Sequence, residues 1–363
     1  MANEGAESSD AWYEEHGEES DVVVSTRVRL ARDLADFPFP MRFRDGDAQR
    51  VRATVFDAFL HCSDSEKYQS VITSQLDFVG RLILCERGVI RPTTPVTSGT
   101  GIVIRNDGVF SCVVNDGDHL KLSAFRAGMN GVGAFEICKK IDDELQNSLQ
   151  FAASREHGYL TSFICDCGSG MRVSFRVHLP AISFAGKVEE NAAFLEERGL
   201  GIRDCFGVSA EKTGTLGSFY EIFTKTGGNG SEIDQMANIL GALKTIVEIE
   251  RHTSEELFKT RITEIKDRVY KAYAGAKFSF LCTARSAVET LSAIKWGKNL
   301  GLLDGVTDGD LAALIYRIQT GHIQFVMRNR QFKFPDDIER SRTLSENHIR
   351  AMLLQETLGK LTF

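Results

Sequence analysis

The chain has 363 residues, of which 42% are hydrophobic, and it carries a formal net charge of −7. A chain of this length can bury a sizeable core and is expected to form one large domain and a smaller one. The acidic balance argues against general nucleic-acid binding, and no apolar run approaches the roughly 18 residues of a membrane-spanning helix. The eight cysteines are scattered and mostly lie within apolar patterns, which predicts reduced thiols in a cytoplasmic protein and no metal site.

The N-terminal segment 1–20 is polar and acidic. It lacks a basic stretch followed by an apolar one, so it predicts a disordered tail rather than a secretory signal. The first structured element is a predicted strand over 22–30, where three valines precede an alternating run. Residues 47–61 and 64–76 are predicted to be helical or mixed segments.

Strands dominate the next part of the chain. Gly and Asn-Asp-Gly turn signals separate β-like runs at 81–85, 101–105, 109–115 and 120–124. A helix is expected over 134–155 because apolar residues recur there every four positions, at Ile137, Ile141, Leu145 and Leu149. The elements predicted after it are strands at 159–165 and 171–179, a short helix at 188–199 and a strand at 217–224.

From Ser231 onward the pattern is helical. Ser231 is a good N-cap, and a long helix is expected to reach about residue 274 with a break near 252–254. Further helices are predicted at 284–301, 308–319 and 336–357, and no strand signal follows residue 224. We therefore predict a tail over 1–20, a sheet-containing domain over 21–250 and an all-helical domain over 251–363.

Arg27 and Arg29 lie two residues apart in the first predicted strand, so both guanidinium groups are expected on one face of the sheet. Neighbouring cations repel one another unless an anion lies between them, and arginine matches phosphate oxygens in bidentate geometry. A polyphosphate is therefore one candidate ligand. A solvated strand face is the alternative that this pair alone also allows.

Cationic residues also stand in several other predicted segments: Lys121 with His119, Arg172, and Arg203. Arg172 follows Gly168-Ser169-Gly170, whose backbone N–H groups could approach a phosphate, although such glycine turns are common. Convergent Arg and Lys groups are what phosphoryl transfer requires, because its catalysis is mostly positioning and neutralisation of charge. The sequence contains neither a P-loop nor the protein-kinase motif set.

Five stretches carry a family resemblance, and they follow one another along residues 21–350. They are Ser25–Arg32 (STRVRLAR), Glu86–Ile90 (ERGVI), Asn115–Lys121 (NDGDHLK), Gly168–Pro180 (GSGMRVSFRVHLP), and the helical tail with Leu300–Leu303 (LGLL) and Gln319–Gln324 (QTGHIQ). Together they resemble the phosphagen (guanidino) kinase superfamily, and most of all its bacterial protein-arginine kinase branch, McsB.

The resemblance implies an α+β fold, with an antiparallel sheet flanked by helices and an all-helical C-terminal domain. It implies ATP-dependent phosphorylation of arginine side chains in proteins, with Mg²⁺ as the accompanying ion. Lys121 stands where the family usually has arginine, and it is expected to contact the nucleotide together with His119. The residues that the resemblance expects to hold ATP on the sheet are Arg27, Arg29, Arg172 and Arg203.

The resemblance also implies partners. We expect protein substrates that bear arginine, a homodimer formed through the C-terminal domain, and a cytoplasmic location. A small zinc-finger activator and a Clp ATPase are further expected partners, because the branch marks proteins for the Clp protease. No nucleic-acid or membrane partner is expected.

The acidic loop departs from the family at one catalytic position. The family's second loop carboxylate positions the substrate guanidinium and accepts its proton, and here Gly117 takes that place. Asp116 and Asp118 match the neighbouring acidic positions. Either is therefore a candidate to replace the missing carboxylate.

Two more catalytic positions are displaced. The family's reactive cysteine aligns with Phe163 without a gap, and Cys165 is the candidate if the loop is two residues shorter. A second acidic position aligns with Val208, and Glu211 is the candidate if that loop is longer. For Cys165 and its neighbour Cys167, the alternative is a pair of core thiols on a strand.

Two functions fit this pattern. The first is an active protein-arginine kinase with a rebuilt acidic site, and the second is a pseudokinase that binds ATP and acts as an adaptor or regulator. A small-molecule guanidino kinase is disfavoured, because those enzymes carry a small helical domain before the sheet domain rather than a helical domain after it.

Overall fold

The structure is a computed structural model that describes residues 12–207, 215–228 and 230–362. Its centre is an eight-stranded sheet in the order β2-β3-β4-β5-β1-β8-β10-β9, and each neighbouring pair is antiparallel. In chain order these strands are β1 (Val23–Arg32), β2 (Tyr68–Ile72), β3 (Gly101–Arg105), β4 (Phe110–Asp116), β5 (Asp118–Ala127), β8 (Met171–His178), β9 (Leu200–Asp204) and β10 (Phe219–Thr224).

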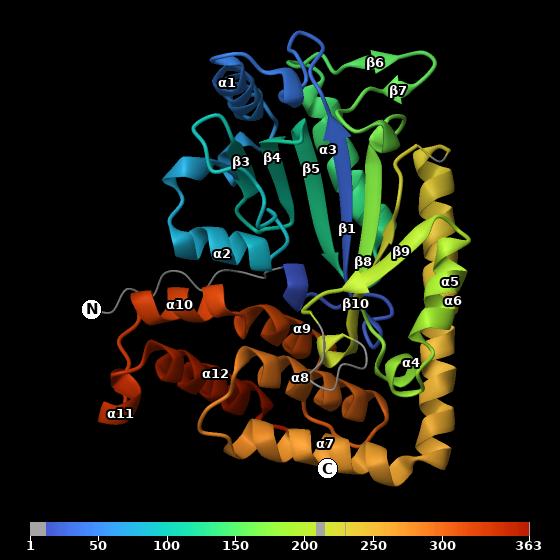
Figure 1. Cartoon of the computed structure of the whole chain (residues 1–363), viewed down its shortest axis with the longest axis vertical. Coiled ribbons are helices and arrows are strands. Elements are labelled where there is room, and N and C mark those ends of the chain that lie inside the picture. The colour runs from blue at the N-terminus through green and yellow to red at the C-terminus, as the bar shows by residue number, and fades with distance from the viewer. Residues whose placement is uncertain (1–11, 208–214, 229, 363) are drawn as a thin grey trace.

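One face of the sheet is covered by α3 (Gly131–Leu145) and by part of the long helix α6 (Glu232–Thr260) (Figure 1). Apolar side chains of both helices belong to the same core as Val28 and Leu30 of β1, which are fully buried. Because side chains alternate along a strand, the residues between them point to the opposite face of the sheet. The other helices beside the sheet are α1 (Asp47–Leu60), α2 (Phe78–Glu86), α4 (Pro180–Phe184) and α5 (Val188–Glu196).

Helices alone follow the sheet along the chain, and they pack around a second apolar core that includes Trp296 and Leu314 (Figure 1). Helix α6 begins with a capping box formed by Ser231 and Asp234. Helix α9 begins with a second one, formed by Thr307 and Asp310. The helices after α6 are α7 (Ile262–Phe278), α8 (Ala284–Asn299), α9 (Asp308–Arg317), α10 (Thr320–Asn329), α11 (Asp336–Glu339) and α12 (Arg342–Leu358).

The predicted fold class is confirmed, as an antiparallel sheet flanked by helices and followed by a helical region. The strands at 101–105, 109–115, 120–124 and 171–179 and the helix at 47–61 are also confirmed within a few residues. The predicted domain boundary between residues 250 and 251 falls inside α6, and the division into domains stays a prediction.

Two strand predictions are wrong. Residues 81–85 belong to α2, because the side chain of Asp77 accepts a hydrogen bond from the Gly80 N–H at 2.7 Å and caps a helix there. In the segment 159–165, only the first residue pairs, in the two-stranded hairpin of β6 (Ala153–Ser154) and β7 (Gly158–Tyr159). The chain then turns into a 3₁₀ helix, Ile164–Asp166, before which the Ser162 N–H donates to Asp118 and the Phe163 carbonyl accepts the Thr161 hydroxyl.

Four details of the ends and helices also differ from expectation. Residues 12–20 are not a disordered tail: Trp12 and Tyr13 are buried against aromatic rings that include Phe125, and residues 1–11 lie outside the described chain. The long helix breaks at Arg261 rather than near 252–254, and the predicted helix at 336–357 is divided into α11 and α12. Helix α10 was not predicted.

Candidate active site

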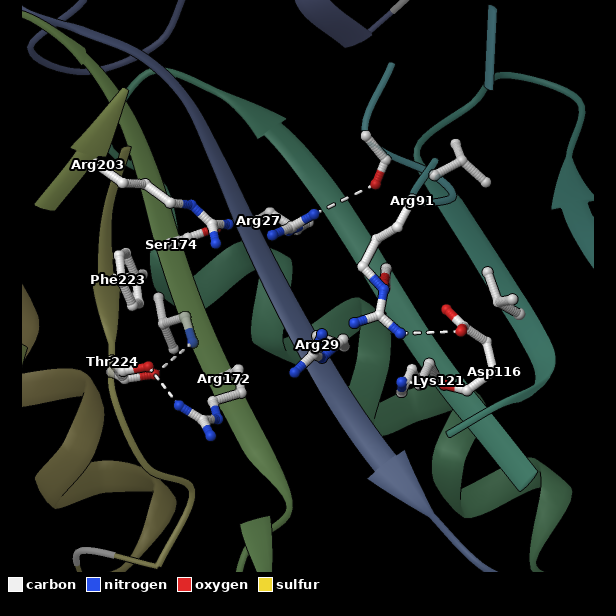
Figure 2. A pocket seen from close by; sticks show the side chains of 15 residues that line it. Arg27, Arg29, Arg91, Asp116, Lys121, Arg172, Ser174, Arg203, Phe223 and Thr224 are labelled. Carbon is white, nitrogen blue, oxygen red and sulfur yellow. Dashed lines mark hydrogen bonds and ion pairs between the residues drawn. The ribbon is translucent and has the colours of Figure 1, made fainter. Parts of the chain in front are cut away.

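A cavity of about 300 Å³ lies on the face of the sheet opposite α3. Figure 2 shows the guanidinium groups of Arg27, Arg29, Arg172 and Arg203 facing one space, with Lys121 on the neighbouring strand. The full lining is Arg27, Arg29, Gly88, Val89, Arg91, Val113, Asp116, Lys121, Ser123, Arg172, Val173, Ser174, Arg203, Phe223 and Thr224.

The strand register explains why these cations meet. Arg29 of β1 lies directly opposite Arg172 of β8 and opposite Ser123 of β5 in the two ladders that flank β1. Arg27, two residues earlier, lies opposite Ser174 and therefore shares the same face. The structure thus brings together the arginines that sequence analysis placed in separate segments.

Glu221 neutralises one side of this pocket. Its two carboxylate oxygens accept hydrogen bonds from Arg27 at 3.0 Å and from Nε of Arg203 at 2.7 Å. Burial acts to raise the pKa of Glu221, but the two arginines outweigh it and lower the pKa to about 2. Sequence analysis missed Glu221, although its place opposite Arg203 on β10 could have been found once the strands were paired.

Arg29 is much less well neutralised. Its nearest carboxylate is Asp166, at 3.9 Å from Nη2, and its Nε is buried with no hydrogen-bond partner among the described residues. Burial and the charge of Arg27 lower the pKa of Arg29 to about 10. A guanidinium in this position attracts an anion, and the nearby Arg172 adds to that field.

The acidic side of the pocket contains a cation that sequence analysis missed. Nη2 of Arg91 donates a hydrogen bond to Oδ1 of Asp116 at 2.9 Å. The other carboxylate oxygen of Asp116 accepts a hydrogen bond from the Thr94 hydroxyl at 3.1 Å. Burial acts to raise the pKa of Asp116, but Arg91 and Lys121 outweigh it and lower the pKa. Asp116 therefore lines the pocket with both oxygens already bound, and Figure 2 shows its contact with Arg91.

Gly117 forms the one-residue turn between β4 and β5, with a φ of +90°. A Cβ atom at this position would lie 2.9 Å from Nζ of Lys121 and 2.9 Å from the ring of Phe163. Both the backbone conformation and the space therefore favour glycine. Phe163 is the residue that the ungapped resemblance sets at the family's cysteine position, and its ring adjoins Gly117.

Asp118 lies beneath this corner and has no exposed surface. One oxygen accepts the Ser162 N–H at 2.9 Å, and the other lies 3.7 Å from Nζ of Lys121 without a hydrogen bond. Burial raises the pKa of Asp118 and lowers that of Lys121. Nζ of Lys121 also donates to the backbone oxygen of Asp116.

His119 does not reach the pocket, so the expectation that it contacts a nucleotide does not fit the structure. Its Nδ1 accepts the Leu34 N–H at 2.8 Å, and its Nε2 lies 3.1 Å from the Pro38 carbonyl. The ring stacks on Phe43, and burial lowers its pKa to about 4. The segment after β1 that carries Leu34, Pro38 and Phe43 surrounds the ring, which the spacing alone could not show.

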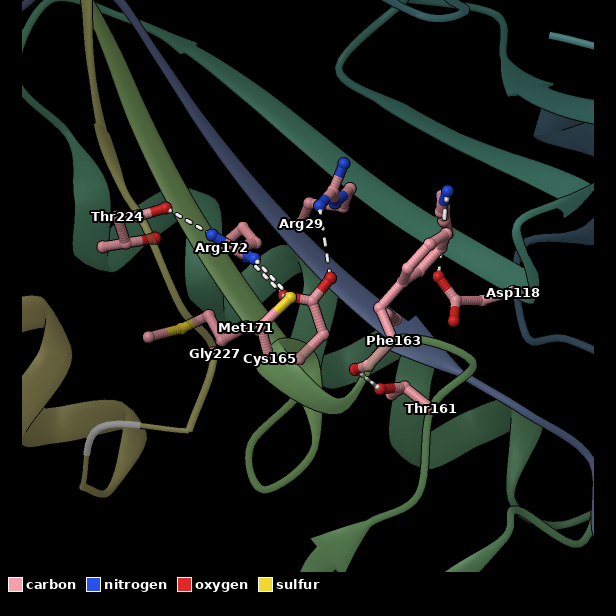
Figure 3. A network of polar contacts seen from close by, with 12 residues as sticks. Arg29, Asp118, Thr161, Phe163, Cys165, Met171, Arg172, Thr224 and Gly227 are labelled. Atoms are coloured by element: carbon pink, nitrogen blue, oxygen red, sulfur yellow. Dashed lines mark hydrogen bonds and ion pairs between the residues drawn. The ribbon is translucent and has the colours of Figure 1, made fainter. Parts of the chain in front are cut away.

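Cys165 adjoins the arginine side of the pocket, where its sulfur lies 3.4 Å from Nη2 of Arg172 (Figure 3). The alternative of two core thiols on a strand is wrong, because Cys165 is exposed and Cys167 follows it out of a 3₁₀ helix. Glu211 and Val208 lie outside the described residues. Among the residues that are described, no group of three or more His, Cys, Asp or Glu side chains could hold a metal ion.

Arginines from paired strands line a cavity on the open face of an antiparallel sheet, and comparison with known proteins shows which class of protein has this arrangement. Residues 50–253 match the family described as ATP:guanido phosphotransferase, C-terminal catalytic domain, and residues 262–362 match the protein-arginine kinase McsB C-terminal domain. The chain therefore belongs to the ATP:guanido phosphotransferase family. Within that family it falls in the protein-arginine kinase branch, as its relatives show.

One such relative is the protein-arginine kinase of Halothermothrix orenii, 30% identical over 314 residues that cover 86% of this chain and 89% of the relative. That of Brevibacillus brevis is 29% identical and covers 95% and 96% of the two chains. Among solved structures, lombricine kinase has a TM-score of 0.55 at 19% identity, covering 65% of this chain and 68% of that one. A taurocyamine kinase of Schistosoma mansoni has the same TM-score and identity over 73% and 38%. These structures support the fold.

Proposed function

We propose that this chain transfers the γ-phosphoryl group of ATP to the guanidinium of arginine side chains in proteins. The observation that carries the proposal is the convergence of Arg27, Arg29, Arg172 and Arg203 on one cavity in which Arg29 lacks a close counter-ion. A triphosphate supplies the missing negative charge. The names of the relatives, protein-arginine kinases, support arginine in proteins as the acceptor.

The four cavity arginines would contact different parts of the triphosphate. Arg29 and Arg172, adjacent across the β1–β8 ladder, are placed to neutralise charge that develops on the transferred group. Arg27 and Arg203 stand further along the same face and would hold the rest of the triphosphate. Mg²⁺ would add neutralisation, and its ligands would be mainly phosphate oxygens, because such sites usually take only one or two carboxylates from the protein.

The catalytic assignments of Asp116, Asp118, Cys165 and Glu211 stay proposals. Asp116 is supported by its place in the cavity wall, and Cys165 by its contact with Arg172. Asp118 lies behind the wall, where it is placed to hold Lys121 rather than to meet a substrate directly.

The test is a transfer assay on the full chain with γ-³²P-labelled ATP, Mg²⁺ and casein as the arginine-bearing acceptor. We expect label that is stable in base and lost in acid, as a phosphorus–nitrogen bond requires, and no label with Arg29→Ala. Label on casein that survives acid contradicts the proposal. So does the absence of label when the folded chain is given saturating ATP.

A second candidate is an ATP-binding pseudokinase that acts as an adaptor or regulator. It is favoured by one observation: the turn at Gly117 excludes a side chain, and the ring of Phe163 fills the adjoining space. ATP binding in a thermal-shift assay, together with no transfer to any tested arginine, would select this function over the first.

The cellular setting is also proposed. The match of residues 262–362 to the McsB C-terminal domain supports a homodimer, a zinc-finger activator and a Clp ATPase as partners in the cytoplasm. No helix in the described part of the chain combines the length and apolar character needed to cross a membrane. Light scattering coupled to gel filtration tests the dimer, for which we expect twice the mass of the 40.3 kDa chain.

A further inference from the structure

A guanidinium acceptor needs a carboxylate that can hold it and take up a proton, and three carboxylates near the cavity are poorly placed for this. Both oxygens of Asp116 are bound, by Arg91 and Thr94. Both oxygens of Glu221 are likewise taken by arginines. Asp118 is covered completely.

Asp166 differs from Asp116 and Glu221 in that only one of its oxygens accepts a hydrogen bond from a described residue, and from Asp118 in that it is not fully covered. It ends the 3₁₀ helix Ile164–Asp166, and its side chain is 7% exposed. One oxygen accepts a hydrogen bond from Nε of Arg172 at 2.5 Å, and the other lies 3.9 Å from Nη2 of Arg29. Its partners are therefore the two cavity arginines that the proposed function assigns to the transferred phosphate.

The surface beside Asp166 is open to a protein-borne side chain. Ile164 is 91% exposed and Cys165 is exposed, so the cavity can be approached over the 3₁₀ helix. On the acidic side of the cavity, Gly117 and Phe163 leave no room for a carboxylate from the turn. Asp166 directly follows Cys165 in the 3₁₀ helix, and Figure 3 shows Cys165 beside Arg172, so a guanidinium that enters past Cys165 comes close to Asp166.

We infer that Asp166 is the carboxylate that receives the substrate guanidinium, an inference that rests on the function proposed above. Phosphate oxygens bound to Arg29 and Arg172 share those cations, which leaves an oxygen of Asp166 available to the acceptor N–H groups. The attacking nitrogen forms a bond to the γ-phosphorus, and the bond from that phosphorus to the β,γ-bridging oxygen breaks. The electron pair leaves on ADP, and the acceptor's N–H proton passes to Asp166 and then to water.

The experiment compares Asp166→Asn with Asp107→Asn, an aspartate that pairs with Arg105 away from the cavity. Affinity for Mg·ATP is measured by calorimetry, affinity for an arginine-bearing peptide is measured in the presence of Mg·AMP-PNP, and transfer is measured with γ-labelled ATP. For Asp166→Asn we expect Mg·ATP affinity to stay within about threefold, and peptide affinity to fall about 10- to 100-fold, as loss of a charged hydrogen-bond partner predicts. Transfer should fall at least as far, Asp166→Glu should regain part of the peptide affinity, and Asp107→Asn should change none of the three.

If Asp166→Asn lowers the affinity for Mg·ATP and leaves the affinity for the peptide unchanged, Asp166 only orients the arginines. That result would overturn the inference. If the unaltered chain transfers no phosphate, the proposed function fails, and peptide affinity alone then decides the role of Asp166. Absence of peptide binding by the unaltered chain overturns the inference as well.

Discussion

The arginine side of the cavity and its acidic side are built on different kinds of backbone. Arg29 and Arg172 stand on paired strands, where the ladder fixes both their spacing and the face to which they point. The acidic side depends on the turn at Gly117, on the loop that carries Phe163, and on a salt bridge to Arg91. The arginine side keeps the residues that the family resemblance implies. The acidic side has glycine where that resemblance implies a carboxylate.

The difference shows which property of a site follows from sheet geometry and which does not. A period of two along β1 and β8 is enough to place cations on one face, whatever surrounds them. A carboxylate at a turn depends on φ and on a neighbouring side chain, so one glycine and one phenylalanine can remove it together. The following substitutions test the two sides separately.

The largest effect is expected on the arginine side. Arg29→Ala should weaken Mg·ATP binding by about 100-fold, because it removes a charged hydrogen-bond partner of the phosphates, a loss of about 1.5–3 kcal/mol per bond. Arg105→Ala is the matched control: its side chain is 23% exposed, against 25% for Arg29, and it stands on the same sheet outside the cavity. Equal losses in both variants, measured by calorimetry, would contradict a specific role for Arg29.

On the acidic side, Gly117→Glu should lower the free energy of unfolding rather than repair the site. We expect a loss of about 2–3 kcal/mol in urea denaturation, from the left-handed backbone and from the contact with Phe163. Gly186→Glu is the control for the backbone effect alone, because Gly186 has a φ of +70° with open space around it, and it should lose about 1 kcal/mol. Adding Phe163→Ala should restore part of the free energy of unfolding lost in Gly117→Glu. It should restore none of the loss in Gly186→Glu.

The two sides should also respond oppositely to pH. Glu221 has a folded pKa of about 2, below its ordinary value of 4.5, so its contribution is present above pH 4.5 and is lost as pH falls towards 2. Glu221→Gln should therefore destabilise the chain by about 2 kcal/mol at pH 7 and by less at pH 3. Asp118 has a raised pKa, so its burial lowers stability as pH rises above 3.8. Asp118→Asn should accordingly become more favourable, relative to the unaltered chain, as pH rises.

Unfolding in urea at several pH values measures both trends. A deficit of Glu221→Gln that grows as pH falls would show that the arginines do not stabilise its charged form.

The smallest effect is expected at Cys165. Cys165→Ser should change Mg·ATP affinity by less than about threefold, because Arg172 keeps its contacts with Asp166 and with the Thr224 carbonyl. Iodoacetamide should label the exposed Cys165 well before Cys112, which is buried and whose pKa is raised by burial. Faster labelling of Cys112 than of Cys165, read by mass spectrometry, would contradict this arrangement.

Much of the arginine side could be predicted from the sequence, because alternation in a strand is a local property. The period of two in the first predicted strand places Arg27 and Arg29 on one face, whereas the sequence shows Arg172 only as a cation in a separate segment. Lys121 and Arg203 also reach the cavity. Their shared role as nucleotide ligands stays a prediction until a ligand is bound.

The rest depends on contacts between distant segments. Glu221 and Arg91 are ordinary charged residues in the sequence, and only the pairing of β10 with β9 and the return of the loop after α2 bring them to the cavity. His119 has the right spacing, but its ring is bound by Leu34 and Pro38 of the segment after β1 and does not line the cavity. Asp166 lies just after the predicted strand 159–165, and the 3₁₀ helix Ile164–Asp166, which was not predicted, brings its side chain to Arg172 and Arg29.

The central claim is that arginines from separate strands hold one triphosphate, and an experimental structure of the full chain with Mg·AMP-PNP tests it most directly. We predict β- and γ-phosphate oxygens within hydrogen-bond distance of Arg29 and Arg172, at about 2.7–2.9 Å, with Arg203 close to the same nucleotide. A nucleotide bound elsewhere on the chain, with these guanidinium groups still directed only at Asp166 and Glu221, would contradict the claim.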